Sequence, residues 1–350
     1  MTGALRNAAL AICFLAVLGV GRANAAAGSA TEFYTGRNIQ ILIGAEVGST
    51  YDKYARVLGR HIKRYIPGGP SVVFKNSIGA DGRKALTWLH EFGANDGSII
   101  GAVRPDAIMA PLLIDKKSAE AIKYDPLRFV FIGSAARTVH VCIIRNDSPA
   151  QTLEEARKQP LIMGANRQGG PLRNTALALA RVLGARFRIV NAYRDLAQTV
   201  RGLEEGEVHG ICGYEYGNLM RTRPDLIKED KVKIMLQYAL KGHSALLKRN
   251  IPMMWNYSRN DSEREVLRIL TASQVFARPY LLPPGVPSDR VGVLRSAFER
   301  TMRDLNFQAD ARKAKLDLYL TSGREIDSQI KKLFSAPDFI VERARAARQG

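Results

Sequence analysis

The chain has 350 residues, enough for two domains of ordinary size, and 46% of them are hydrophobic and 24% charged. These values are typical of a globular protein and exclude a disordered, collagen-like or coiled-coil chain. The 52 Lys and Arg residues outnumber 33 Asp and Glu, and the net charge of +19 favours anionic partners. Three cysteines are too few for a disulfide scaffold.

The N-terminal segment has the three-part layout of a secretory signal peptide. Arg6 provides a positive charge, residues 8–20 form an apolar run, and Ala23-Asn24-Ala25 is an A-x-A cleavage signal. Cys13 lies inside the apolar run, where it is not placed for lipid attachment. We therefore expect residues 1–25 to be a signal peptide and the mature protein to be exported with a charge of +17.

Export would leave two cysteines, Cys142 and Cys212, in a compartment that permits a disulfide. Both lie in apolar, strand-like runs, where a buried free thiol is the more usual state. We expect free thiols, and a bridge between the two remains open as the alternative.

Short apolar runs alternate with helical patterns along most of the chain. A first series predicts strands at 38–44, 71–76, 98–103 and 129–135 and helices at 54–66, 83–92 and 106–114. A second series predicts strands at 139–145, 161–165, 187–191, 208–212 and 232–238 and helices at 153–158, 172–183 and 196–205. This βαβα order indicates two α/β domains with parallel sheets covered on both faces.

The C-terminal part follows a different pattern. A strand-like run at 274–277 precedes a turn-rich break at 282–287. Three helices are predicted after it, at 289–304, 308–316 and 325–348.

No common catalytic or metal-binding motif occurs in the chain. The sequence contains no G-x-S-x-G, C-x-x-C, H-E-x-x-H, G-x-G-x-x-G or Walker-type loop, and its five histidines are never paired at ligand spacing. His140 and Cys142 would share one face of a strand, which is a weak indication of a Cys–His pair. Nucleic-acid signatures are also absent, and the basic residues are spread over the whole length. We expect no catalytic residues, no metal, no cofactor and no nucleic-acid partner.

Four predicted strand-to-helix turns carry Gly and small polar residues, which suit an anion-binding helix N-terminus. Such turns lie at the carboxyl ends of parallel strands, where ligands collect in open sheets. Each turn could equally be a capped helix start, but two in each domain indicate a cleft between the domains. The candidate ligand-binding residues are Gly48, Ser49, Thr50, Asp52, Ser77, Gly79, Asn166, Arg167, Gly169, Gly170, Tyr193 and Asp195. Among them Asp52 fits a helix cap better than a ligand contact, and Arg167 is the permanent cation of the four turns.

The order of these segments resembles a known family, the Bug-type periplasmic receptors of tripartite tricarboxylate transporters. The resemblance covers almost the whole mature chain, and each segment alone is weak, so it depends on nine segments in the same order. They lie at 37–43, 48–56, 76–82, 96–97, 124–126, 164–171, 191–193, 206–208 and 282–287. Two segments depart from the family pattern: a Pro-Gly-Gly-Gly turn is Glu46-Val47-Gly48 here, and a Gly-x-Val-Asp strand is Gly206-Glu207-Val208-His209.

The resemblance implies a two-lobed periplasmic binding protein of type II with a ligand cleft between the lobes. Lobe 1 would comprise 33–137 and 272–350, and lobe 2 would comprise 138–271. A monomeric receptor in the periplasm would capture a small organic acid, a carboxylate, and deliver it to the membrane permease of an ion-gradient-driven transporter. Two alternatives remain: a permease-free sensor that binds a signalling protein, and an exported enzyme that uses His140 and Cys142 or a site without a recognised motif.

Overall fold

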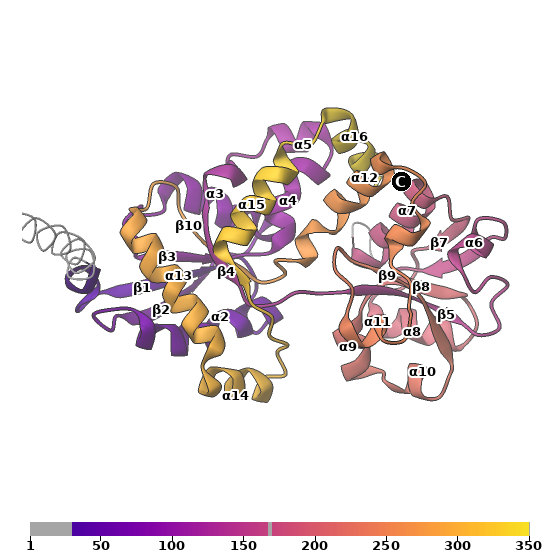
Figure 1. Cartoon of the computed structure of the whole chain (residues 1–350), viewed down its shortest axis with the longest axis horizontal. Helices are drawn as coiled ribbons and strands as arrows, with labels where there is room; N and C mark the ends of the chain where they lie inside the picture. Colours follow the sequence, from indigo (N-terminus) through magenta and orange to yellow (C-terminus); the bar gives the residue numbers. More distant parts are fainter. Residues whose placement is uncertain (1–29, 167–169, 350) are drawn as a thin grey trace, which may run out of the picture.

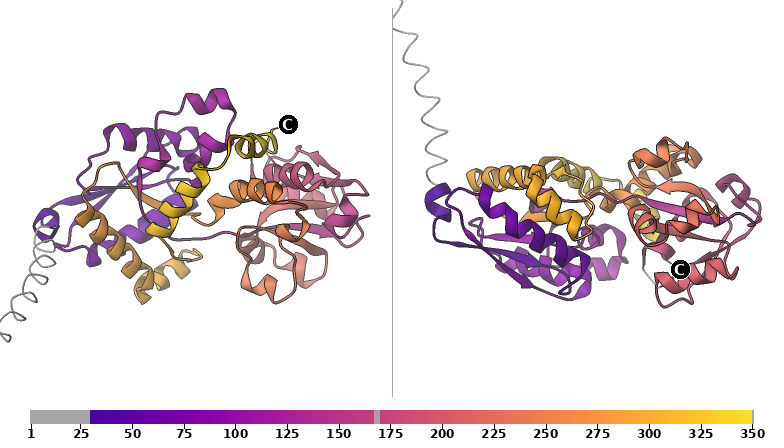
Figure 2. Two further views of the ribbon diagram at one scale, coloured as in Figure 1. Left: turned by 45° about the horizontal axis from the view of Figure 1, so that its top comes forward. Right: turned by 90° about the horizontal axis from the view of Figure 1, so that it is seen from below.

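The computed structural model describes residues 30–166 and 170–349, which form two lobes side by side along the long axis of the molecule (Figure 1). Each lobe contains one β-sheet with helices packed on it, and this arrangement is visible from two further directions in Figure 2. The α/β, two-lobed fold class predicted from the sequence is confirmed. The expected signal peptide, 1–25, lies outside the described residues.

The sheet of the first lobe has the strand order β11-β4-β10-β3-β1-β2. Its members are β1 (Asn38–Ile43), β2 (Ser71–Asn76), β3 (Ile99–Ala102), β4 (Val130–Ser134), β10 (Pro279–Leu282) and β11 (Thr321–Ser322). Strands β1, β2 and β3 are parallel, whereas β10 is antiparallel to both of its neighbours, β3 and β4. The carboxyl ends of β1, β2 and β3 therefore lie at the same edge as the start of β10.

The helices of the first lobe cover both faces of this sheet. They are α2 (Thr50–Ile62), α3 (Arg83–Phe92), α4 (Pro105–Leu113), α5 (Lys116–Glu120), α13 (Ser288–Arg303), α14 (Leu305–Lys313) and α15 (Gly323–Phe334). Helix α2 begins four residues before the predicted start because the Ser49 side chain caps it, accepting a hydrogen bond from the Asp52 backbone N–H at 3.3 Å. Its apolar face, which includes Ala55, Leu58 and Ile62, is buried.

The sheet of the second lobe has the order β7-β6-β8-β5-β9. Its strands are β5 (His140–Arg145), β6 (Leu161–Gly164), β7 (Phe187–Val190), β8 (Gly210–Glu215) and β9 (Val232–Tyr238). The helices are α6 (Leu153–Ala156), α7 (Pro171–Leu183), α8 (Leu196–Glu204), α9 (Tyr216–Thr222), α10 (Asp225–Lys228), α11 (Ser244–Leu247) and α12 (Asp261–Thr271). Strand β5 is antiparallel to β8 and β9, while β6 is parallel to β7 and β8.

The expectation of purely parallel sheets was wrong, because each sheet contains a strand that runs against its neighbours. Both of these strands, β5 and β10, follow segments that cross between the lobes. A strand that enters a sheet from the other lobe starts at the edge where the parallel strands end, so it must run in the opposite direction. The two mixed sheets therefore follow from the double crossing of the chain.

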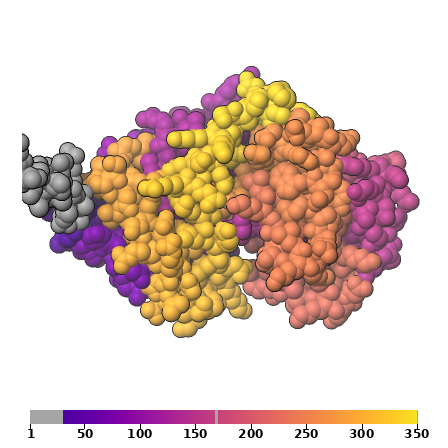
Figure 3. All heavy atoms as spheres, in the orientation of Figure 1, coloured from indigo at the N-terminus to yellow at the C-terminus, as the bar shows by residue number. Residues whose placement is uncertain are grey.

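The C-terminal helix α16 (Asp338–Ala346) connects the lobes a third time. It packs against α12 and against α4 of the first lobe, and Arg345 donates a hydrogen bond to the Pro111 carbonyl at 2.8 Å. In the space-filling view the yellow C-terminal segment lies across the boundary between the lobes (Figure 3). One buried apolar cluster includes Leu112, Leu267 and Ile340 from these three helices, so the lobes share part of their core.

Two predicted elements of the C-terminal part were misplaced. The strand expected at 274–277 is β10, which begins five residues later at Pro279, and residues Ala272–Gln274 form a 3₁₀ turn. The single helix expected at 325–348 is broken into α15 and α16 by Pro337, which lacks a backbone N–H and cannot continue a helix.

The expectation of free thiols was also wrong, because Cys142 and Cys212 form a disulfide. They are register partners on the antiparallel strands β5 and β8, and both are fully buried. The two residues are 70 positions apart, and sequence periodicity does not show which strands are paired. Among the described residues no helix is long and apolar enough to cross a membrane.

Candidate ligand-binding site

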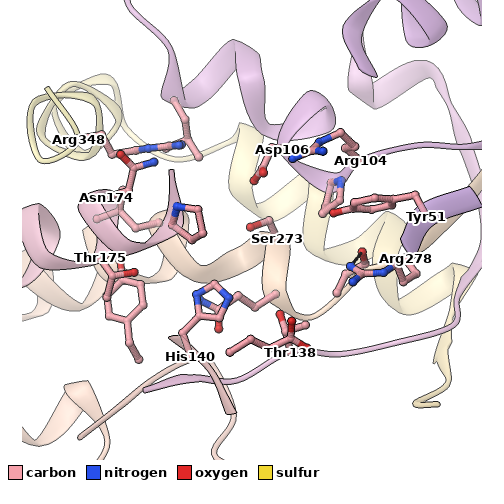
Figure 4. A pocket seen from close by; sticks show the side chains of 18 residues that line it. Tyr51, Arg104, Asp106, Thr138, His140, Asn174, Thr175, Ser273, Arg278 and Arg348 are labelled. Atoms are coloured by element: carbon pink, nitrogen blue, oxygen red, sulfur yellow. Dashed lines mark hydrogen bonds between the residues drawn. The ribbon is translucent and has the colours of Figure 1, made fainter. Parts of the chain in front are cut away.

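A cavity of about 250 Å³ lies between the lobes, at the strand ends that face their boundary (Figure 4). The first lobe contributes residues that follow β3 and precede β10, and the second contributes the start of β5, the end of β8 and the start of α7. This is the position where ligands bind in open α/β sheets. Small-molecule sites usually have volumes of roughly 300–1,000 Å³, so a ligand held here must be small.

Two arginines and a tyrosine form the cationic wall of the cavity. The guanidinium carbon of Arg278 lies 4.4 Å from the ring centroid of Tyr51, and that of Arg104 lies 5.2 Å from it. Figure 4 draws the two arginines on opposite sides of this ring, which positions both by cation–π contact. The Nε atoms of both are buried and have no hydrogen-bond partner among the described residues. Each guanidinium group therefore has a free hydrogen-bond donor that could bind an anion.

The second lobe places a carboxylate against this wall. Glu215 is the last residue of β8, is partly buried, and lines the cavity. Burial raises the pKa of its carboxyl group, and the nearby guanidinium groups of Arg278 and Arg221 oppose this effect. In the part of the chain that the structure describes, the Glu215 side chain has no hydrogen bond or ion pair. Asp106, in the first turn of α4, is an exposed second carboxylate of the lining.

His140 is the cross-strand partner of Glu215 and lines the same cavity. Burial lowers its pKa to about 4, although the nearby Asp106 carboxylate acts in the opposite direction. The Gln274 side-chain amide donates a hydrogen bond to His140 Nδ1 at 3.4 Å. The imidazole is therefore neutral at pH 7 and contributes a polar wall without charge.

The rest of the lining is polar and includes Thr138, Asn174, Thr175, Ser273 and, from the C-terminal tail, Arg348. A wider cavity of about 840 Å³ adjoins it, because Thr138 and Glu215 line both.

The proposed Cys–His pair is not available as a nucleophile and base, because the sulfur of Cys142 is bonded to Cys212. Over residues 30–166 and 170–349, no group of three or more His, Cys, Asp or Glu side chains could hold a metal ion.

The first predicted turn is closed by its own hydrogen bonds. Gly48 has a φ of +79°, which favours glycine, and its N–H donates to Asp52 Oδ2 at 2.9 Å. The same carboxylate, only 2% exposed, accepts from Arg56 Nε at 2.9 Å and from Asn76 Nδ2 at 3.0 Å. Burial alone would raise the Asp52 pKa, but these hydrogen bonds outweigh it and lower the pKa. Asp52 thus holds the turn together, while Thr50 begins α2.

The second predicted turn lies beside the first, because β2 pairs with β1. The Ser77 N–H donates to the Ile43 carbonyl at 2.8 Å, and Gly79 has a φ of +138°. Ser77 lines a separate cavity beside α3, together with Trp88.

Of the two predicted turns of the second lobe, the one before α7 adjoins the interlobe cavity, whereas no residue of the one before α8 lines it. Gly170 caps α7, next to Pro171 of the lining, and the buried Oδ1 of Asn166 has no described partner. Arg167 and Gly169 lie outside the described residues. Tyr193 donates to Glu207 at 2.8 Å, and Asp195 caps α8 by accepting from the Gln198 N–H at 2.9 Å.

None of the ten described candidates lines the interlobe cavity, although Tyr51 and Pro171, which follow Thr50 and Gly170, do. Sequence reasoning missed Arg104, Arg278 and Glu215. The first could have been found, because Val103-Arg104-Pro105 also joins a strand to a helix, although it lacks the Gly and small polar residues of the four selected turns. Arg278 and Glu215 are brought to the cavity by β10 and β8. The sequence predicted the bounds of these two strands less accurately than those of β1 and β2.

Comparisons with known proteins indicate the fold. No family model matches the chain, and no curated protein matches it. A TctC solute-binding protein from Polaromonas, solved without ligand, is 16% identical with a TM-score of 0.67 over 89% of this chain and 98% of that one. The periplasmic binding protein BugD is 19% identical, with a TM-score of 0.55 over 90% and 98%. MatC from Rhodopseudomonas palustris with bound malate is 16% identical, with a TM-score of 0.55 over 90% and 99%.

These identities are low, so the likeness concerns the fold, and at that level it confirms the resemblance drawn from the sequence. The chain has the two-lobed fold of the TctC and Bug-type periplasmic solute-binding proteins.

Proposed function

We propose that the protein is a periplasmic solute receptor that binds a small organic acid between its lobes. In this proposal the signal peptide directs export, lobe 1 comprises 33–137 and 272–350, and lobe 2 comprises 138–271. The loaded monomer then delivers its ligand to the membrane permease of a tripartite, ion-gradient-driven transporter. Two proteins of the same fold support the ligand class, since MatC was solved with malate and a second R. palustris protein with adipate.

The observation that carries the proposal is the pair of arginines in the interlobe cavity. Arg104 and Arg278 each have a buried Nε without a partner in the described chain. A buried donor left unsatisfied costs about 1–3 kcal/mol, and a carboxylate would satisfy both groups through charge-assisted bonds. An organic acid is the simplest ligand that removes this cost.

Helix N-termini offer a second source of donors. Helix α2 begins at Thr50 and α7 at Pro171, and both helices border the cavity through their first turn. The first N–H groups of a helix have no partner within it and favour negative charge. We propose that the turns around Gly48–Thr50 and before α7 contribute such contacts once a ligand draws the lobes together.

The test is a thermal-shift screen of the purified protein against mono-, di- and tricarboxylates. A ligand at 100 times its Kd adds about 2.7 kcal/mol to the free energy of unfolding, which raises the melting temperature measurably. We expect at least one acid to do so, and the shift to shrink in Arg278→Ala. Stabilisation by no organic acid, at millimolar concentrations, would overturn the proposal.

A further inference from the structure

The interlobe cavity contains charges of both signs: the first lobe contributes two arginines and the exposed Asp106, and the second lobe contributes Glu215. Arg104 and Arg278, on the first lobe, form one wall (Figure 4). Glu215 lines the cavity from the end of β8 in the second lobe. A carboxylate in the site disfavours a plain dicarboxylate as ligand, because like charges repel each other.

Glu215 is near the Arg278 and Arg221 guanidinium groups, which lower its pKa, but no hydrogen bond within the described fold holds its carboxylate in place. It caps no helix by its side chain, and no described residue forms a hydrogen bond or ion pair with its carboxylate. Its cross-strand neighbour His140 is neutral at pH 7 because burial lowers the histidine pKa to about 4. A partly buried carboxylate without a partner is costly, and a bound cation would remove that cost.

We infer that the solute carries a cationic nitrogen as well as its carboxylate, so that the ligand class is a small amino acid. The carboxylate would bind Arg104 and Arg278, and the ammonium group would bind Glu215. This inference rests on the proposed function, because it specifies the ligand of the same site. A molecule with both charges would connect the two lobes, which a ligand bound to one wall cannot do.

Specificity for an amino acid over its deaminated counterpart follows from the same geometry. A site that hydrogen-bonds a ligand N–H rejects an analogue that lacks it, since the buried acceptor is then left unpaired. A ligand with hydrogen in place of the ammonium would still displace water from the Glu215 carboxylate. It would offer this carboxylate no hydrogen bond or opposite charge in return. A second carboxylate at that position would also repel it.

Proton linkage gives an independent readout. Three charged groups act on Glu215: the Arg278 and Arg221 guanidinium groups lower its pKa, and the Asp317 carboxylate raises it. Burial has the largest effect and also raises this pKa. A bound ammonium would lower this pKa, so binding near the pH of half-protonation would release protons to the buffer. A second ligand carboxylate would raise the pKa and cause proton uptake instead.

The experiment is isothermal titration of the purified protein with matched pairs: aspartate and succinate, glutamate and glutarate, and alanine and propionate. A thermal-shift screen of the twenty amino acids precedes it and selects further pairs. Each titration is repeated in two buffers of different ionisation enthalpy between pH 5 and 7, which yields the number of protons exchanged. Two variants are compared with wild type: Glu215→Gln, and as a control Glu205→Gln, an exposed residue whose carboxylate pairs with Arg201 on α8.

We expect an amino acid to bind at least tenfold more tightly than its deaminated partner, with proton release. Glu215→Gln should abolish both the preference and the release, and Glu205→Gln should change neither. Equal binding within every pair, a preference that survives Glu215→Gln, or proton uptake would overturn the inference and leave the proposed function intact. Binding of neither amino acids nor deaminated acids would instead overturn the proposed function.

Discussion

His140 and Glu215 lie directly opposite each other on β5 and β8, and both side chains line the cavity between the lobes. Burial shifts their pKa values in opposite directions, lowering that of His140 and raising that of Glu215. In each case burial favours the uncharged form of the side chain. The second lobe therefore presents a pair of titratable groups to the two arginines of the first.

Arg278 should dominate carboxylate binding. We expect Arg278→Ala to weaken the binding of an organic acid by about 1.5–3 kcal/mol, roughly 10- to 100-fold, because a hydrogen bond to a charged group is lost. Arg278→Lys should recover only part of this, since lysine lacks the planar fork of donors. Calorimetric titration measures both. Arg300→Ala is the matched control, since Arg300 also stacks on a tyrosine, Tyr65, but outside the cavity. Equal affinity in wild type and Arg278→Ala would contradict the assignment.

Asp52 should act on stability through the turn that it closes. Asp52→Asn is expected to lower the free energy of unfolding at pH 7 by about 1.5–3 kcal/mol, because charge-assisted hydrogen bonds from Arg56 and Gly48 are lost. The folded pKa is lowered, so this stabilisation is present above the usual pKa of aspartate and disappears as the pH falls through the folded value. Urea denaturation at pH 7 and at pH 3 measures both effects.

Asp261→Asn provides the control for that measurement, because the Asp261 side chain is 96% exposed. It should change the free energy of unfolding by less than about 0.5 kcal/mol. An Asp52→Asn protein as stable as wild type at pH 7 would show that the turn does not depend on the carboxylate.

The disulfide should be a major contributor to stability. It closes a loop between residues 70 positions apart, so removing it releases considerable chain entropy in the unfolded state. We expect Cys142→Ala with Cys212→Ala to lower the free energy of unfolding by about 2–5 kcal/mol. Denaturant titration checks this. Mass spectrometry after alkylation of the denatured, unreduced protein provides a separate check: a label on Cys142 or Cys212 would show that the bridge is absent.

His140 should make the fold sensitive to acid. Its folded pKa is about 4, below the ordinary value of 6.5, so between these pH values the unfolded chain binds a proton that the folded protein does not. The free energy of unfolding should therefore fall as the pH is lowered from 7 to 4. His140→Gln should remove this component, so the stability difference between variant and wild type should change across the window. A difference that stays constant from pH 7 to pH 4 would contradict the prediction.

The sequence predicted the regular elements of both lobes because their apolar residues alternate or repeat at helical spacing. Strands β1 and β2, for example, lie within one residue of their expected ends. What it could not provide was the direction and neighbour of strands that enter from the other lobe. Strand β10 is only four residues long and starts with Pro279, so it has little periodicity of its own.

The site was predicted only by its position at the strand ends between the lobes. The candidate residues lie in turns, most of them rich in glycine, and in the described part of the chain these turns are largely closed by their own hydrogen bonds, as the Gly48–Asp52 turn shows. Arg278 and Glu215 lie about 60 residues apart in sequence, and both line the cavity because β10 begins and β8 ends at the same boundary. The proximity of these two residues depends on the order and direction of the strands, which composition and local residue spacing do not predict.

The place of β10 in the first sheet also fixes the order in which the protein can fold. Strand β10 lies between β3 and β4 and pairs with both, yet it is made only after the whole of the second lobe. A nascent chain that ends before Pro279 can complete the sheet of the second lobe, but it leaves β3 and β4 with unpaired edges. Such edges are prone to pair with other chains, so the first lobe is the part of the molecule most exposed to wrong pairing until β10 is made.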